Sequence, residues 1–281
     1  DWDLIIKPFH QKGAVVSIRE FTNNAMNHHH GMQSVERFGQ GDDPDLDGIV
    51  DELTVGDITA VTIFQAALPA PGPVASRYAA RRRAAARGEK LFEEVGCGSC
   101  HRSTLVLASS QFSEPNPFNP PGNLRPSEVS ASFAFDLANG PRGGQLTKVP
   151  GGGALVHAFT DLKRHNLNDA DLDHFDNEQV PQGSLVGFAD PTDFTVLIND
   201  QRPTGEFLTR KLWDAGNSDP YGHRGDLTTL TEAIHFHGGD ARTQRVAFFA
   251  LPESGQDDII EFLKSLQAPR VAPNSSQRRK Q

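Results

Sequence analysis

One five-residue run constrains this chain more than any other feature of its sequence. The only two cysteines, Cys97 and Cys100, are separated by two residues, and His101 directly follows the second. This Cys-x-x-Cys-His pattern is the attachment signature of c-type haem. Two thiols at this spacing can form thioether bonds to the two vinyl groups of one porphyrin, while the adjacent imidazole ligates the iron. The sequence therefore predicts one covalent haem c on Cys97 and Cys100, with His101 as proximal ligand.

Two other interpretations of the cysteine pair remain open at this stage. A thioredoxin-like redox pair also has this cysteine spacing, but it needs no following histidine and comes after a strand. Half of a zinc site would need two further cysteines or well-spaced histidines elsewhere in the chain.

The sequence on either side of the cysteines predicts helices. Residues 88–95 place three apolar side chains on one helical face that leads into the cysteine run. A second helix is predicted near the C-terminus, with Ser254 and Asp257 as an N-terminal capping pair. Two helices flanking a haem motif indicate a cytochrome c domain.

The fold class that follows is mainly α, a cytochrome c domain with long irregular loops. We place this domain at 75–267, after a segment at 1–74 that completes a region between two haems, and before a disordered tail at 268–281. A hydrophobic content of 37% suffices for one large core or two smaller ones, and 26 glycines and 19 prolines indicate many loops.

Charge and hydropathy exclude two classes of partner. The net charge of −9 has the wrong sign for a protein that binds nucleic acid through its phosphates. No apolar run approaches the roughly 20 residues that a membrane span requires, so we expect no membrane span. Covalent c-type haem is assembled outside the bacterial cytoplasm, which indicates a periplasmic protein whose signal segment was removed.

The second axial ligand of the iron can be sought by elimination. Methionine is a common ligand in electron-transfer cytochromes c, but Met26 and Met32 both lie far upstream of the haem motif. The downstream candidates are His157, His165, His174, His223, His235, His237 and Tyr221. A capping box at Thr229 predicts a helix whose apolar face also carries His237. We predict His237 as distal ligand; a hydrogen-bonded core histidine, or one that only orients a ligand, is the alternative.

Three further residues are candidates for the haem edge. Tyr221, His223 and Trp213 lie close in sequence to the predicted helix, and loop hydrogen bonds or core packing would explain them equally well. A basic cluster lies on the helix that precedes the cysteines: Arg81, Arg82, Arg83 and Arg87. A solvated helix face explains this cluster, with propionate pairing or docking of an acidic electron donor as the alternatives.

Several segments resemble a known family. Residues 216–225, 227–234 and 237–240 resemble the C-terminal haem domain of the bacterial di-haem cytochrome c peroxidase superfamily, and more closely its di-haem oxidoreductase branch. Residues 159–165 and 23–33 resemble two other segments of these proteins. The position that matches the distal methionine of the peroxidases is occupied by histidine here.

The resemblance implies a function and partners. We expect an electron-transferring haem c domain of a di-haem cytochrome c peroxidase-like oxidoreductase, which reduces hydrogen peroxide or another small oxidant in the complete protein. A small cytochrome or cupredoxin would be its redox partner. The family has two haem motifs and this chain has one, so we expect the second haem on residues before Asp1. The alternative is a mono-haem cytochrome c that carries electrons without turnover.

An acidic stretch at 43–54 has the pattern of a calcium loop. Carboxylates stand at its positions 1, 3, 5 and 9: Asp43, Asp45, Asp47 and Asp51. Gly48 occupies position 6, whereas Thr54 stands where such loops have a glutamate. Family peroxidases bind calcium between their haem domains, so the resemblance favours Ca²⁺ over a plain acidic turn.

One histidine near the N-terminus is a candidate contact of the second haem. Ser17 and Glu20 predict the start of a helix, on which Ile18 and Phe21 begin an apolar stripe that His29 continues. We therefore expect His29 to point inward, against the second haem or a peroxide pocket. A structural histidine is the alternative.

Overall fold

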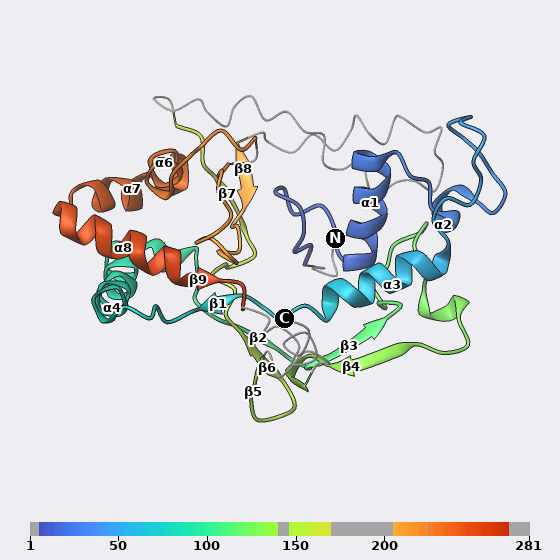
Figure 1. Ribbon diagram of the computed structural model, residues 1–281, viewed down its shortest axis with the longest axis horizontal. Helices are drawn as coiled ribbons and strands as arrows, with labels where there is room; N and C mark the ends of the chain where they lie inside the picture. Colours follow the sequence, from blue (N-terminus) through green and yellow to red (C-terminus); the bar gives the residue numbers. More distant parts are fainter. Residues whose placement is uncertain (1–5, 140–145, 170–204, 223, 270–281) are drawn as a thin grey trace, which may run out of the picture.

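The computed structural model describes residues 6–139, 146–169, 205–222 and 224–269, whose helices form two groups (Figure 1). One group contains α4, α6, α7 and α8, and the other contains α1, α2 and α3. The expected disordered tail lies almost entirely outside the described residues, as do His174 and His223. No helix in the described ranges is long and apolar enough to cross a membrane.

Two helices form the core of the first group. Helix α4 (Ala79–Glu94) packs against α8 (Glu253–Ser265). They contribute buried side chains to one apolar cluster with α7: Phe92, Phe248, Ile259, Phe262 and Leu263. Gly88 allows the close approach, because a Cβ atom there would collide with the backbone carbonyl of Asp258. Both predicted helices are present here.

The predicted start of α8 is wrong by two residues. Pro252 is the N-cap and makes no side-chain hydrogen bond, so Ser254 lies inside the first turn instead of capping it. Proline suits a helix start because its fixed φ angle matches the helix and its missing N–H is not needed there.

The remaining helices of this group follow the cysteines and the predicted capping box. Residues Cys97–Ser99 form a short 3₁₀ turn directly after α4. Helix α6 (Leu230–His235) begins with the predicted capping box, because Thr229 accepts from the backbone N–H of Glu232 and Glu232 accepts from that of Thr229. Helix α7 (Arg242–Phe249) comes next, after a 3₁₀ turn at Gly239–Ala241.

Short antiparallel strands connect the helices. They form four small sheets in the described ranges: β1 (Gly72–Pro73) with β9 (Leu266–Gln267); β2 (Leu105–Leu107), β6 (Ala154–Val156) and β5 (Thr147–Lys148); β3 (Gln111–Glu114) with β4 (Phe133–Asp136); and β7 (Arg164–Asn166) with β8 (Glu206–Leu208). The mainly α class stays a prediction, since helices and small sheets occur together.

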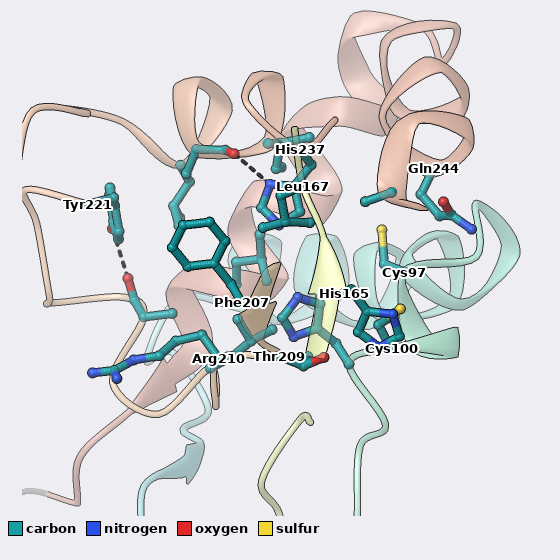
Figure 2. A pocket seen from close by; sticks show the side chains of 18 of the residues that line it. Cys97, Cys100, His165, Leu167, Phe207, Thr209, Arg210, Tyr221, His237 and Gln244 are labelled. Carbon is teal, nitrogen blue, oxygen red and sulfur yellow. Dashed lines mark hydrogen bonds between the residues drawn. The ribbon is translucent and has the colours of Figure 1, made fainter. Parts of the chain in front are cut away.

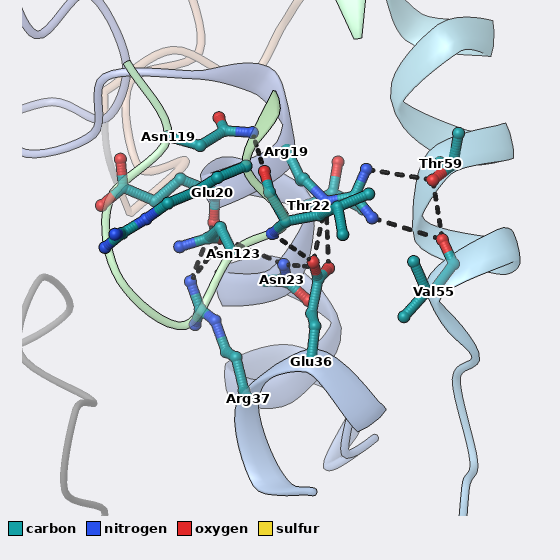
Figure 3. Close-up of polar contacts among 12 residues, drawn as sticks. Arg19, Glu20, Thr22, Asn23, Glu36, Arg37, Val55, Thr59, Asn119 and Asn123 are labelled. Atoms are coloured by element: carbon teal, nitrogen blue, oxygen red, sulfur yellow. Dashed lines mark hydrogen bonds and ion pairs between the residues drawn. The ribbon is translucent and has the colours of Figure 1, made fainter. Parts of the chain in front are cut away.

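The second group is held by buried polar side chains. It consists of α1 (Ile18–His30), α2 (Val35–Phe38) and α3 (Val55–Ala66). Arg19 on α1 is fully buried and forms ion pairs with Glu36, at 2.8 Å, and with Glu114, at 2.6 Å. Figure 3 shows Arg19 between α1 and α3, with Asn23 and Asn123 close by.

Candidate haem site

A cavity of about 580 Å³ lies where the cysteine turn, the antiparallel pair β7–β8, the loop before α6 and helices α6 to α8 meet. Cys97, Cys100, His101 and His237 all line it, and most of the other lining side chains are apolar. We call this space the ligand cavity (Figure 2). Its volume and its few convergent polar groups are typical of a small-molecule or cofactor site.

His101 is fixed by a backbone contact on one side of its ring. Its Nδ1 lies 2.9 Å from the carbonyl oxygen of Phe159, which can only accept, so Nδ1 donates and the lone pair is on Nε2. Burial, and after it the nearby His237, lowers the pKa of His101 to about 4. The imidazole is therefore neutral near pH 7, which is the form that ligates a metal.

His237 has the same arrangement from the other side of the cavity. Helix α6 ends at His235, so His237 lies two residues beyond the helix on which it was predicted. Its Nδ1 donates to the carbonyl oxygen of Ala233 at 2.6 Å, which again leaves the lone pair on Nε2. Burial lowers the pKa of His237. A backbone carbonyl on one ring nitrogen is how proteins usually orient a metal-ligating histidine.

The two imidazoles face each other across the cavity. Their ring centroids are 6.4 Å apart and their planes are inclined by 50°. Two imidazoles that ligate one metal ion from opposite sides, each with a nitrogen about 2.0 Å from it, hold their centroids roughly 6 Å apart. His101 and His237 therefore fit the two axial positions of a haem iron, and the neighbouring Cys97 and Cys100 fit its thioether bonds.

The cysteines do not fit a thioredoxin-like redox pair. They form no disulfide with each other, and they follow a helix where a thioredoxin-like pair follows a strand. Burial raises the pKa of Cys97 to about 11, and burial also raises that of Cys100. Redox-active pairs have one thiol with a lowered pKa, because the thiolate is the reactive form.

A possible small-metal cluster lies beside the cysteines and was missed by sequence reasoning. Ligand atoms of Cys100, Asp161 and His165 lie within 4.8 Å of one another. His165 Nε2 is 2.8 Å from Asp161 Oδ2, while the Thr209 hydroxyl donates to Asp161 Oδ1 at 2.7 Å. The cluster includes neither Cys97 nor the proximal histidine, so zinc binding there would leave most of the five-residue run unexplained. The only sequence signal was the family-like segment 159–165.

The structure places two of the three haem-edge candidates on the ligand cavity. Tyr221 and Trp213 both line it, but their polar groups are already used. The Tyr221 hydroxyl donates to the carbonyl oxygen of Ala215 at 2.8 Å, and Trp213 Nε1 donates to that of His157, also at 2.8 Å. The third candidate, His223, lies outside the described residues.

The basic cluster on α4 does not line the ligand cavity. Its members Arg81, Arg82, Arg83 and Arg87 are all exposed. A 16-residue helix is about 24 Å long, and the first three of these arginines lie in its N-terminal half, away from the cysteines that follow its C-terminus. Arg87 binds Asp258 on α8 with two hydrogen bonds, of 2.7 and 2.6 Å. Propionate pairing by this cluster has no support in the structure.

The prediction that His29 points inward is wrong. His29 is exposed at the end of α1. The buried residues of this helix are Arg19, Glu20, Thr22, Asn23 and Asn24, whereas Ile18 and Phe21 are only half-buried. The face that carries His29 was expected to be buried because it is apolar, but the ion pairs of Arg19 bury the polar face instead.

The acidic loop brings three of its four carboxylates together. Oxygens of Asp43, Asp45 and Asp47 lie within 4.8 Å of one another. Asp51 instead accepts a hydrogen bond from the backbone N–H of Gly41 at 2.8 Å. Carboxylates this close repel one another, and a hard cation such as Ca²⁺ relieves that repulsion.

Comparison with known proteins adds no relative. No family model, curated protein or solved structure matches the chain. The cysteine run and the ligand cavity are therefore the features that indicate its function. Within that cavity, the strongest support for a haem site is that the neutral His101 and His237 face each other beside the cysteines.

Proposed function

We propose that this chain is the electron-transferring haem c domain of a di-haem cytochrome c peroxidase-like oxidoreductase. The observation that supports this most directly is the opposition of His101 and His237 across a cavity that Cys97 and Cys100 also line. The resemblance of segments 216–225 and 159–165 to these proteins supports the peroxidase class.

In this proposal the cysteines anchor the haem and the histidines ligate its iron. Bound haem supplies reversible uptake of one electron. Cys97 and Cys100 would hold the macrocycle covalently, and the mostly apolar lining of the cavity would cover its faces. The backbone carbonyls of Phe159 and Ala233 keep the two imidazoles in place. With two protein ligands on the iron, a small oxidant has no free position, so peroxide reduction belongs to a second haem of the complete protein.

A mono-haem cytochrome c that only carries electrons is the other candidate. The same ligation by His101 and His237 favours it, because a closed iron site suits electron transfer with no turnover. The haem count of the full-length natural protein separates the two, since two haems per chain indicate the enzyme and one indicates the carrier. Both candidates place the protein in the periplasm, with a small cytochrome or cupredoxin as redox partner.

The haem content of the chain tests the proposal itself. The protein would be produced in the periplasm of a host that matures c-type haem and measured as its pyridine haemochrome, with bound metals quantified alongside. We expect one haem per chain that resists extraction by acidified acetone, and none in the Cys97→Ala, Cys100→Ala double variant. Stoichiometric zinc without haem would contradict the proposal and would favour the cluster around His165.

We further propose that the acidic loop binds Ca²⁺ through Asp43, Asp45 and Asp47. Its support is the approach of the three carboxylates and the spacing of the motif. In the family it resembles, calcium lies between the haem domains, and the loop belongs to the segment at 1–74 that we expect to complete that region.

A further inference from the structure

The cationic side chains that line the ligand cavity differ in whether they have a hydrogen-bond or ion-pair partner. Three Lys or Arg side chains line it in the described ranges: Arg210, Lys211 and Arg245. Lys211 Nζ donates to the carbonyl oxygen of Pro8 at 2.5 Å, and Arg245 pairs with Asp169 at 3.2 Å. Arg210 alone of the three has no side-chain hydrogen bond or ion pair to any described residue. Within the described part of the chain, the guanidinium of Arg210 is therefore the one on this cavity with no side-chain partner.

The backbone of Arg210 contacts His101, but its side chain extends away from the cysteines. Figure 2 shows Cys97 and Cys100 on one side of His237, and Arg210 and Tyr221 on the other. In a haem the two vinyl groups lie at one edge of the macrocycle and the two propionates at the opposite edge. A haem attached through the cysteines therefore directs its propionates towards the Arg210 end. Tyr221 cannot serve them without giving up its hydrogen bond to Ala215.

The charges at the two ends of the cavity match this orientation. At the cysteine end, a carboxylate oxygen of Asp161 lies within 4.8 Å of the Cys100 sulfur, and one of Asp240 is 3.9 Å from His165 Nδ1. These carboxylates would repel a propionate. Lys211 follows Arg210 in the chain; burial lowers its pKa to about 8, and the positive charge of Arg210 lowers it too. Among the residues that the structure describes, neither cation has a carboxylate partner, which favours an anion between or beside them.

We propose that Arg210 binds a haem propionate and so fixes the orientation of the macrocycle between its two histidine ligands. This inference rests on the proposed function, because it requires covalent haem. Guanidinium is suited to the role since it pairs with a carboxylate through two parallel hydrogen bonds and stays charged at any physiological pH. A cation at the propionate edge also favours the reduced iron, whose complex carries one positive charge less.

Redox titration across a range of pH tests the contact. The reduction potential of the haem would be measured from pH 4 to pH 9 in the wild type, Arg210→Gln, Arg210→Lys and Arg83→Gln, the last removing an exposed arginine outside the cavity. Loss of the guanidinium lets a propionate protonate more easily. We expect the inflection of potential against pH in Arg210→Gln to move upward by about 1–3 pH units. Its potential at pH 7 should fall, and Arg210→Lys should lie between Arg210→Gln and the wild type.

The possible results separate this inference from the function on which it rests. Coincident curves for the wild type and Arg210→Gln would overturn the inference while leaving haem binding intact. A change in Arg83→Gln as large as that in Arg210→Gln would show a general charge effect and would overturn the inference too. Absence of covalent haem in the wild type would overturn the proposed function itself. If Arg210→Gln is recovered without haem, Arg210→Lys decides, since a curve identical to that of the wild type excludes a specific guanidinium contact.

Discussion

His101 and His237 face each other across the ligand cavity at 6.4 Å between ring centroids, and each donates its Nδ1–H to a backbone carbonyl. The two residues are 136 positions apart in the sequence, but in each the contact with a carbonyl leaves the lone pair on Nε2. Such preorganisation lowers the cost of ligation, because neither imidazole must lose rotational freedom or a proton when a metal binds.

Substitution of Gly88 should destabilise the protein through the α4–α8 crossing. A Cβ atom at Gly88 would collide with the carbonyl of Asp258, so Gly88→Ala must push the helices apart. We expect a loss of about 1–3 kcal/mol in the free energy of unfolding. Gly72→Ala is the matched control, because nothing lies within 4 Å of the added atom there. Chemical denaturation followed by circular dichroism measures both, and equal stabilities would show that the close approach is not needed.

The buried arginine of α1 should matter more than any surface ion pair. Arg19→Met would leave the carboxylates of Glu36 and Glu114 without their counter-charge in the interior. We expect a loss of about 3–5 kcal/mol in unfolding free energy. Arg81→Met removes an exposed pair with Glu261, at 4.0 Å, and should cost under about 1 kcal/mol. A small effect of Arg19→Met in the same denaturation experiment would contradict the account of α1.

Glu20 should make stability depend on pH. Burial raises the pKa of this carboxyl above its usual value, so the folded protein holds the proton more tightly than the unfolded chain. The contribution of Glu20 to the free energy of unfolding is therefore fully present below the unfolded pKa of about 4.5. It is lost as pH rises through the raised pKa of the folded state. Glu20→Gln removes this titration while keeping an acceptor for the backbone N–H of Val16.

Urea denaturation of wild type and Glu20→Gln between pH 4 and pH 8 measures this dependence. The variant should gain stability relative to the wild type as pH rises across that window. Glu89→Gln, which removes an exposed carboxyl outside this contact, is measured beside it as the matched control. If the difference between wild type and Glu20→Gln does not change with pH, the titration of this carboxyl does not contribute.

Calcium should stabilise the protein through the acidic loop. Ca²⁺ at a hundredfold excess over its dissociation constant adds about 2.7 kcal/mol, provided it binds the folded state alone. We expect a rise in Tm with added Ca²⁺ that the Asp45→Asn, Asp47→Asn double variant abolishes. Magnesium is the control, since it is smaller and demands an octahedral site. A Tm that does not respond to Ca²⁺ would contradict calcium binding.

Local patterns predicted the parts of the fold and site that depend on local sequence. The capping boxes at Thr229 and at Thr54, the latter not foreseen, depend on four consecutive residues, and the structure forms both. The periodicity argument placed His237 on the apolar side of α6, and the turn beyond the helix keeps it facing the cavity even though the helix ends earlier.

Contacts between distant segments could not be predicted in this way. Arg19 meets Glu114 across 95 positions, and this pairing decides which face of α1 is buried. Hydrophobic periodicity assumes that the apolar face turns inward, which is why His29 was misplaced. Arg210 belongs to no motif, and its place at the cavity follows only from the path of the chain after β8.

Low-temperature EPR of the oxidised protein, read beside the near-infrared spectrum, tests the central claim most directly. Wild type, His237→Ala and the control His235→Ala would be compared, since His235 is exposed and does not line the cavity. We predict a low-spin bis-imidazole signal in the wild type and in His235→Ala, and a high-spin signal with haem still attached in His237→Ala. A wild type that is already high-spin, or a His237→Ala variant that stays low-spin, would contradict ligation by His101 and His237.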